Sequence, residues 1–149
     1  MDTRSKELVG QLEEILEKNK DAEKGYAKAA ENAKSHGLQN YFRRKSDERR
    51  DFNNQLRRLL VANYDEIDEN GSFTGSIHRA WMDIKSFFSG NEDEAMLEEA
   101  IRGDQAAVKE YEEVLTDEVL PLALDTLIRD QKVKIQRDLN SIKSLQDLE

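Results

Sequence analysis

The stretch that decides the fold runs from Leu38 to Asn63 and reads LQNYFRRKSDERRDFNNQLRRLLVAN. Its apolar residues recur at steps of three and four, the spacing that lines up one face of an α-helix. No proline or glycine interrupts it, so it predicts one unbroken helix about 39 Å long at 1.5 Å per residue. The predicted core stripe consists of Tyr41, Phe42, Phe52, Leu56, Leu59 and Ala62.

Three further helices with the same periodicity flank this stretch. The first is predicted from Ser5 to Lys34, and Gly37 after it suits a left-handed C-terminal cap. The third is predicted from Asn91 to about Thr116, with Glu94 completing a capping box that Asn91 begins. A fourth starts at Pro121, which suits a first helical turn. Their stripes are Leu8, Leu12, Leu16, Ala22, Tyr26, Ala29 and Ala33; Leu97, Ile101, Val108, Tyr111 and Leu115; and Leu124, Leu127, Ile128, Ile135, Ile142 and Leu145.

The lengths of the connections predict the topology. Short turns join helix one to helix two and helix three to helix four, so each pair forms an antiparallel hairpin. The middle connection, about residues 64–91, is long enough to cross the bundle and lets helices two and three run parallel. Within it, Ile77, Trp81, Ile84 and Phe88 share one face of a short amphipathic helix. We therefore expect residues 1–149 to form a single all-α domain, a ferritin-like four-helix bundle with a long crossover.

Composition excludes several classes of protein. Among 149 residues there is no cysteine, which rules out disulfides, thiolate metal sites and cysteine nucleophiles. No segment has the roughly 20 apolar residues of a membrane span, and the polar start of the chain predicts no signal peptide. A cytoplasmic location in a bacterium is the resulting expectation, with no membrane partner.

Charge is strongly uneven along the chain. The net charge of −9 argues against nucleic-acid binding. The segment from Arg43 to Arg58 contains seven basic residues and three acidic ones, whereas the segment from Asn91 to Glu118 contains eleven acidic residues and two basic ones. These segments are expected to attract each other, either within one chain or between copies in a homo-oligomer, most simply a dimer. A basic strip for a phosphate-bearing partner is the alternative.

Three segments resemble one known family. They are GSIHRAWMDIK at 75–85, FFSG at 87–90 and RGDQAAVKEYEE at 102–113. In them the chain is similar to an uncharacterised bacterial family of ferritin-like four-helix bundles, described as a domain of unknown function. The resemblance implies the ferritin-like fold, no known reaction and a loose association with stress responses. That family often carries an extra acid near positions 101 and 105, where this chain has Ile101 and Gln105.

The motif of a ferritin-like metal centre is absent. Such bundles bind two metal ions through Glu residues and a Glu-x-x-His motif on two helices. The residues three positions before His36 and His78 are Ala33 and Gly75, so neither histidine completes the motif. No phosphate-binding glycine loop and no serine nucleophile with a partner base is present either.

Polar residues nevertheless interrupt the stripes near the middle of each helix. One per helix is a candidate ligand for a hard metal such as Fe or Mn: Glu23, Glu48, Asp104 and Gln131, with Asp138 nearby. Three explanations stay open, because buried carboxylates must be paired, protonated or metal-bound. Arg44, Lys45 or Arg49 pairs with them in an inert polar layer, or the stripes are displaced by one position, or a weak metal site exists.

The sequence therefore favours a non-enzymatic protein without a cofactor that acts through self-association or by binding a partner. The alternative is a divergent Fe- or Mn-dependent oxidoreductase or metal store. Trp81, the only tryptophan, is predicted to anchor the crossover helix on the bundle, and its replacement by Ala to cost about 3–5 kcal/mol.

Overall fold

A computed structural model describes residues 3–64, 92–117 and 119–149. Within these ranges the chain forms four long helices and no strand, which confirms the predicted all-α bundle. They are α1 (Thr3–Asn32), α2 (His36–Asn63), α4 (Asp93–Asp117) and α5 (Leu122–Ser141), and a short 3-10 helix, η1 (Leu145–Leu148), follows. The predicted crossover helix, including His78 and Trp81, lies outside the described residues, as does Asn91.

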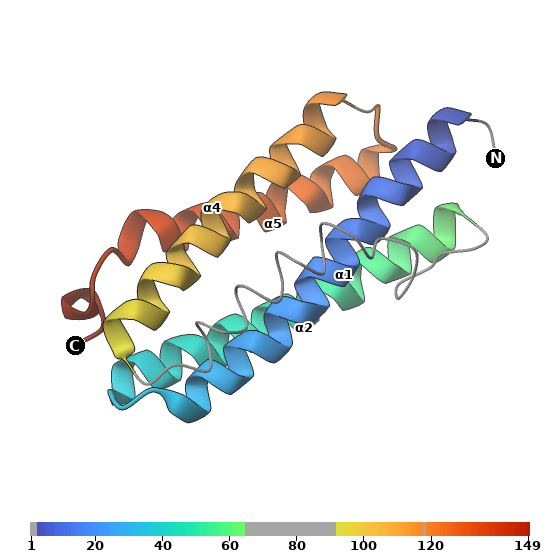
Figure 1. Ribbon diagram of the computed structural model, residues 1–149. Coiled ribbons are helices and arrows are strands. Elements are labelled where there is room, and N and C mark those ends of the chain that lie inside the picture. The colour runs from blue at the N-terminus through green and yellow to red at the C-terminus, as the bar shows by residue number, and fades with distance from the viewer. Residues whose placement is uncertain (1–2, 65–91, 118) are drawn as a thin grey trace.

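The four helices form two antiparallel hairpins that pack side by side (Figure 1). The first hairpin is α1 with α2, and the second is α4 with α5. Between the hairpins, α1 packs on α4 and α2 packs on α5. As a result α2 and α4 stand at opposite corners of the bundle, and they run in the same direction (Figure 1).

The turn between α1 and α2 differs from the prediction. Gly37 is not a left-handed cap, because no described glycine has a positive φ and α2 already begins at His36 with Ser35 as its N-cap. A Cβ on Gly37 would clash with the Leu148 carbonyl oxygen. Glycine is therefore needed at this position because the C-terminal segment lies so close to it.

The start of α4 holds the same turn from the other side. The two carboxylate oxygens of Asp93 accept hydrogen bonds from the backbone N–H groups of Lys34 and Ser35, each at 2.9 Å. These donors lie at the end of α1 and at the N-cap of α2. One side chain of the second hairpin thus fixes the turn of the first.

The fourth helix is shorter than predicted. The predicted stripe continued through Ile142 and Leu145, but α5 ends at Ser141, and Ile142 adopts an extended backbone. Ser144 and Asp147 then form a capping box that starts η1. Leu145 and Leu148 still reach the core, because η1 folds back over the end of the bundle.

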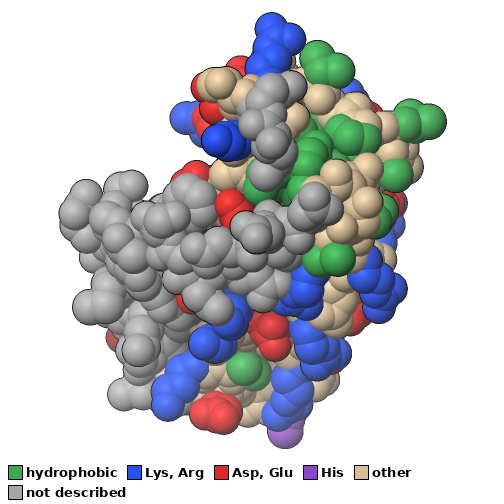
Figure 2. Space-filling model, turned by 90° about the vertical axis from the view of Figure 1, so that its right-hand side faces the viewer, with side chains coloured by type: hydrophobic (Ala, Val, Ile, Leu, Met, Phe, Trp, Pro, Cys, Tyr) green, Lys and Arg blue, Asp and Glu red, His purple; other side chains and the backbone are tan. Residues whose placement is uncertain are grey.

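The core consists of two apolar clusters along the bundle. The first gathers around Leu12, Phe52, Tyr111 and Ile128, and the second, nearer the α1–α2 turn, around Tyr26, Phe42 and Met96. Among the described residues the large hydrophobic side chains that stay exposed are Val61, Val119, Leu122 and Val133. Figure 2 looks onto the end of the bundle where the second hairpin turns, and hydrophobic side chains gather on one side of that end.

Candidate functional site

A layer of polar side chains separates the two apolar clusters. On α2 it contains Lys45 and Arg49, which stand between Phe42 of one cluster and Phe52 of the other. On α4 it contains Asp104, between Ala100 and Val108. Lys45 and Asp104 are 0% exposed and Arg49 is 3% exposed, so these charges are inside the protein. We call this set the polar layer; its other members are Asn19, Tyr26, Tyr111, Gln131 and Asp138.

Asp104 is the centre of the layer. Its Oδ2 accepts a hydrogen bond from the Lys45 ammonium, and its Oδ1 accepts from Arg49 at 2.7 Å and from the Tyr26 hydroxyl at 2.9 Å. Three donors on the first hairpin therefore converge on one carboxylate of the second. Such full pairing is what permits a carboxylate to be buried at all.

Asp138 on α5 extends the layer to the edge of the bundle. Its carboxylate accepts from Lys45 at 3.2 Å and from the half-exposed Arg44 at 2.9 Å. Lys45 thus bridges two acids on two different helices. Its ammonium also lies over the rings of Tyr26 and Tyr41, at 5.5 and 5.6 Å from the ring centres, where cation–π attraction adds to the ion pairs.

A chain of hydrogen bonds between uncharged side chains continues the network from Arg49 across the core. Arg49 donates to Asn19 Oδ1 at 2.7 Å, and Asn19 Nδ2 donates to the Tyr111 hydroxyl at 3.0 Å. Tyr111 in turn donates to Gln131 Oε1 at 2.8 Å, and Gln131 Nε2 donates to the Phe52 carbonyl at 3.1 Å. The chain includes side chains from all four long helices, so it fixes their relative height.

Burial keeps the tyrosines of the layer protonated. Desolvation raises the pKa of Tyr111 to about 12, and it raises the pKa of Tyr26 well above its ordinary value, with the Asp104 charge adding to the effect. Burial disfavours the charged form of Arg49, but the nearby Tyr26 and Asp104 outweigh it, and the pKa of Arg49 is raised. The layer therefore holds neutral phenols and a permanently charged guanidinium.

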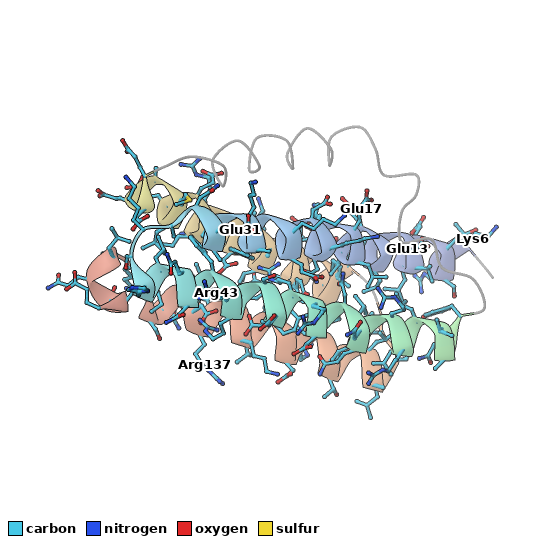
Figure 3. The ribbon with its side chains drawn as sticks, turned by 90° about the horizontal axis from the view of Figure 1, so that it is seen from below. Lys6, Glu13, Glu17, Glu31, Arg43 and Arg137 are labelled. Atoms are coloured by element: carbon cyan, nitrogen blue, oxygen red, sulfur yellow. The ribbon has the colours of Figure 1, made fainter. Side chains whose placement is uncertain are left out.

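The charges of the layer are segregated by hairpin. The buried cations all come from α2, and the acids that pair with them come from α4 and α5. Whole-helix charges follow the same division, with 13 basic and 10 acidic side chains on the first hairpin against six basic and 12 acidic on the second. Arg43 and Arg137 project outward from α2 and α5, away from the layer (Figure 3). Each hairpin thus supplies the counter-charges for the other.

The four predicted metal ligands occupy different environments. Asp104 and Gln131 are fully buried, but the hydrogen bonds above already engage Asp104 Oδ1 and Oδ2 and Gln131 Oε1. Glu48 is at the edge of the layer, with Arg44 at 3.7 Å, and burial raises its pKa. Glu23 is half-buried, and its backbone carbonyl accepts from Ser46.

These donors fit a resident metal ion poorly. Within residues 3–64, 92–117 and 119–149, no three His, Asp or Glu side chains come close enough together to hold a metal. Lys45 and Arg49 already supply positive charge at Asp104. The first of the three explanations, in which basic side chains of α2 turn inward and pair with the acids, describes Asp104; the metal role of Glu23, Glu48, Asp104 and Gln131 stays a prediction.

Sequence reasoning missed Asn19 and Asn53. Both are at least 95% buried, and Asn53 donates to the Leu16 carbonyl at 2.8 Å. A signal existed for Asn19, because it follows Leu12 and Leu16 at the spacing of the core stripe. An asparagine at a stripe position predicts a buried polar contact but not its partner.

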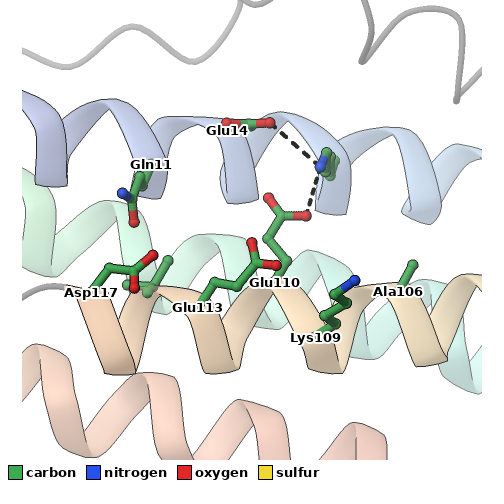
Figure 4. Close-up of a pocket in the computed structure, with 9 residues that line it drawn as sticks. Gln11, Glu14, Ala106, Lys109, Glu110, Glu113 and Asp117 are labelled. Atoms are coloured by element: carbon green, nitrogen blue, oxygen red, sulfur yellow. Dashed lines mark hydrogen bonds and ion pairs between the residues drawn. The ribbon is translucent and has the colours of Figure 1, made fainter.

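Two surface grooves accompany the layer. The α1–α4 groove has a volume of about 440 Å³ and charged walls, with Lys18 held between Glu14 and Glu110 at 3.5 and 2.6 Å (Figure 4). Burial raises the pKa of Glu110. The α4–α5 groove, of about 410 Å³, is mostly uncharged; its lining residues are Ile101, Gln105, Val108, Gln136, Leu139, Asn140, Ile142 and Lys143.

Comparison with known families identifies the chain. The profile of one family, the domain of unknown function DUF2383, matches residues 7–117, which include α2 and α4 with their buried ion pairs. The chain belongs to this family. For this DUF2383 member, no curated protein and no solved structure was found to match. None of the helices in the described part of the chain is long and apolar enough to cross a membrane.

Proposed function

We propose that this protein is a non-enzymatic bundle that acts through its surface, by self-association or by binding a protein partner. The observation that supports this proposal is the pairing of Asp104 with Lys45 and Arg49 in the middle of the bundle. Ferritin-like enzymes use that place for metal-binding carboxylates. Here it is filled by the side chains' own ion pairs.

The internal pairing also removes the means of catalysis from the layer. Catalysis needs a group that can reach substrate, whereas Lys45 and Asp104 are 0% exposed and bonded to each other. Replacing a buried ion pair with apolar residues is often neutral for stability, and in some proteins such pairs select one arrangement of helices. The layer is therefore best explained as a device that specifies how the hairpins pair.

The decisive experiment is elemental analysis of protein purified without chelator and then dialysed against Fe(II) or Mn(II). We expect far less than one metal ion per chain, with no change in Glu48→Ala. Near-stoichiometric Fe or Mn that disappears in Glu48→Ala would overturn the proposal.

The competing function is a metal store or metal-dependent oxidoreductase of ferritin-like type. One observation favours it: Glu48 Oε1 is buried and accepts no hydrogen bond from the described residues. A carboxylate oxygen in that state is a better ligand than either oxygen of Asp104. Retention of metal in Asp104→Asn but not in Glu48→Ala would support this reading.

Further properties belong to the same proposal. The two hairpins, with α2 and α4 running parallel, support the ferritin-like arrangement that we propose. The family resemblance suggests a bacterial protein with a role in stress, and we infer a cytoplasmic location from the composition and a dimer from the uneven charge. Light scattering tests the dimer, because a mass of 17.2 kDa at tens of micromolar would reject self-association.

A further inference from the structure

The outer face of the second hairpin carries a groove that is much less charged than the α1–α4 groove. Four aliphatic side chains, Ile101, Val108, Leu139 and Ile142, line the α4–α5 groove together with three carboxamides, and Lys143 is its only charged lining residue. By contrast, the α1–α4 groove is lined by four carboxylates and two lysines. The lining of the α4–α5 groove is therefore nearly uncharged, and depletion of charged residues is what marks the centre of a protein interface.

Exposed hydrophobic side chains continue this face beyond the groove. Val133 is 47% exposed and stands three residues before Gln136 and seven before Asn140, so all three share one side of α5. Leu122, 82% exposed, stands 11 residues before Val133, which is three helical turns and the same side. We call the groove together with Leu122 and Val133 the α4–α5 face.

The two edges of the α4–α5 face carry opposite charge. Helix α4 has nine acidic and two basic side chains, whereas α5 has three acidic and four basic ones. On the side toward the groove, the exposed acid Glu98 lies near the start of α4 and the cation Lys143 lies just after α5, whereas Arg129 already pairs with Asp125 on its own helix at 2.6 Å. A nearly uncharged strip with an acidic helix on one side and a more basic helix on the other is complementary to itself after a two-fold rotation.

We propose that a second copy of this chain packs against the α4–α5 face, about a two-fold axis parallel to the helices. That axis places α4 of each copy opposite α5 of the other. Equivalent residues of the two copies then lie at the same position along the length of the bundle. Acidic edges then face basic edges on both sides, while Val133 and the groove aliphatics meet in the middle. This inference rests on the proposed function and names the surface through which self-association occurs.

Sedimentation equilibrium of the full chain, compared between two matched variants, tests the surface. Val133→Asp places a charge inside the proposed interface and should raise the dimer dissociation constant roughly tenfold or more, since one uncompensated charge costs at least about 1.4 kcal/mol. Val61→Asp makes the same change on α2, at a side chain 58% exposed and away from the α4–α5 face, and should leave it unchanged. Circular dichroism confirms that both variants fold.

A charge exchange tests the orientation of the axis. Glu98 lies near the start of α4 and Lys143 just after the end of α5, so a parallel axis brings them to similar height in the dimer. Glu98→Lys alone should weaken the dimer, and Lys143→Glu in the same chain should restore it. A double variant as weak as the single one would overturn the proposed axis.

The outcomes separate this inference from the function on which it rests. A monomeric wild-type chain at tens of micromolar overturns self-association and this surface together. A dimer that survives Val133→Asp, whether or not Val61→Asp dissociates it, overturns the α4–α5 face and leaves the proposed function standing. A dimer lost only in Val133→Asp supports both.

Discussion

Replacing Asp104 by Asn removes the central charge of the polar layer while almost preserving its shape. The Asn carbonyl can still accept from Tyr26, but Lys45 then keeps only its ion pair with Asp138, and Arg49 loses its ion pair with Asp104. Because both cations are at most 3% exposed, water cannot compensate them. Breaking a buried pair in this way costs about 3–5 kcal/mol.

That loss is a large part of the total stability. A domain unfolds with about 5–15 kcal/mol, so Asp104→Asn should remove about a fifth or more of it and lower the melting temperature by roughly 10 °C. Urea unfolding followed by circular dichroism measures the change. Asp117→Asn, on the exposed end of α4, is the control and should stay within about 0.5 kcal/mol of wild type.

The energetic coupling between Asp104 and Lys45 provides a second test. Adding Lys45→Met to Asp104→Asn removes one of the two stranded cations, so the double variant should be more stable than the sum of the single effects by about 0.5–3 kcal/mol. A cost below about 1 kcal/mol for Asp104→Asn, or strict additivity with Lys45→Met, would refute the assignment of these side chains to one desolvated network.

Two further predictions concern local packing and pH. Gly37→Ala should destabilise the protein, because its Cβ would clash with the Leu148 carbonyl oxygen. Gly103→Ala, whose Cβ would meet nothing within 4 Å, should stabilise α4 by about 0.5–1 kcal/mol, and thermal unfolding of the two variants measures both effects. Burial raises the pKa of Glu48, so the folded state keeps the proton of the Glu48 carboxyl group to a higher pH than the unfolded state does. The free energy of unfolding therefore falls as the pH rises from the ordinary glutamate pKa through the raised one. Glu48→Gln should therefore gain stability relative to wild type over that range, and a difference in unfolding free energy that does not change with pH would contradict this.

Periodicity was sufficient to predict the helices because a stripe is a local property. The stretch from Leu38 to Asn63 needs no knowledge of its neighbours to bury Phe42 and Leu56 on one face. The boundaries were harder to predict, since Gly37 serves a contact with Leu148 that lies 111 positions further along the chain. A glycine selected for close approach and one selected for a left-handed cap look the same in a sequence.

The sequence predicted that buried polar residues lie in the middle of the bundle, but it did not predict which of them pair with each other. Asp104 at a stripe position signalled a buried acid, and Arg44, Lys45 and Arg49 were the candidate partners. The contact between Lys45 and Asp104 spans 59 positions and depends on how two hairpins dock. Spacing within one helix carries no information about that docking, so the partners of Asn19 and the bridging role of Lys45 could be found only in three dimensions.

The division of charge between the hairpins also bears on the order in which the chain is made. The ribosome releases α1 and α2 before α4 and α5, so for a time the first hairpin exists without its counter-charges. Its inward face then carries Lys45 and Arg49, which repel the same face of a neighbouring nascent chain. Two unfinished copies that meet through their exposed cores therefore bring like charges together, and the ion pairs form once an acidic second hairpin docks.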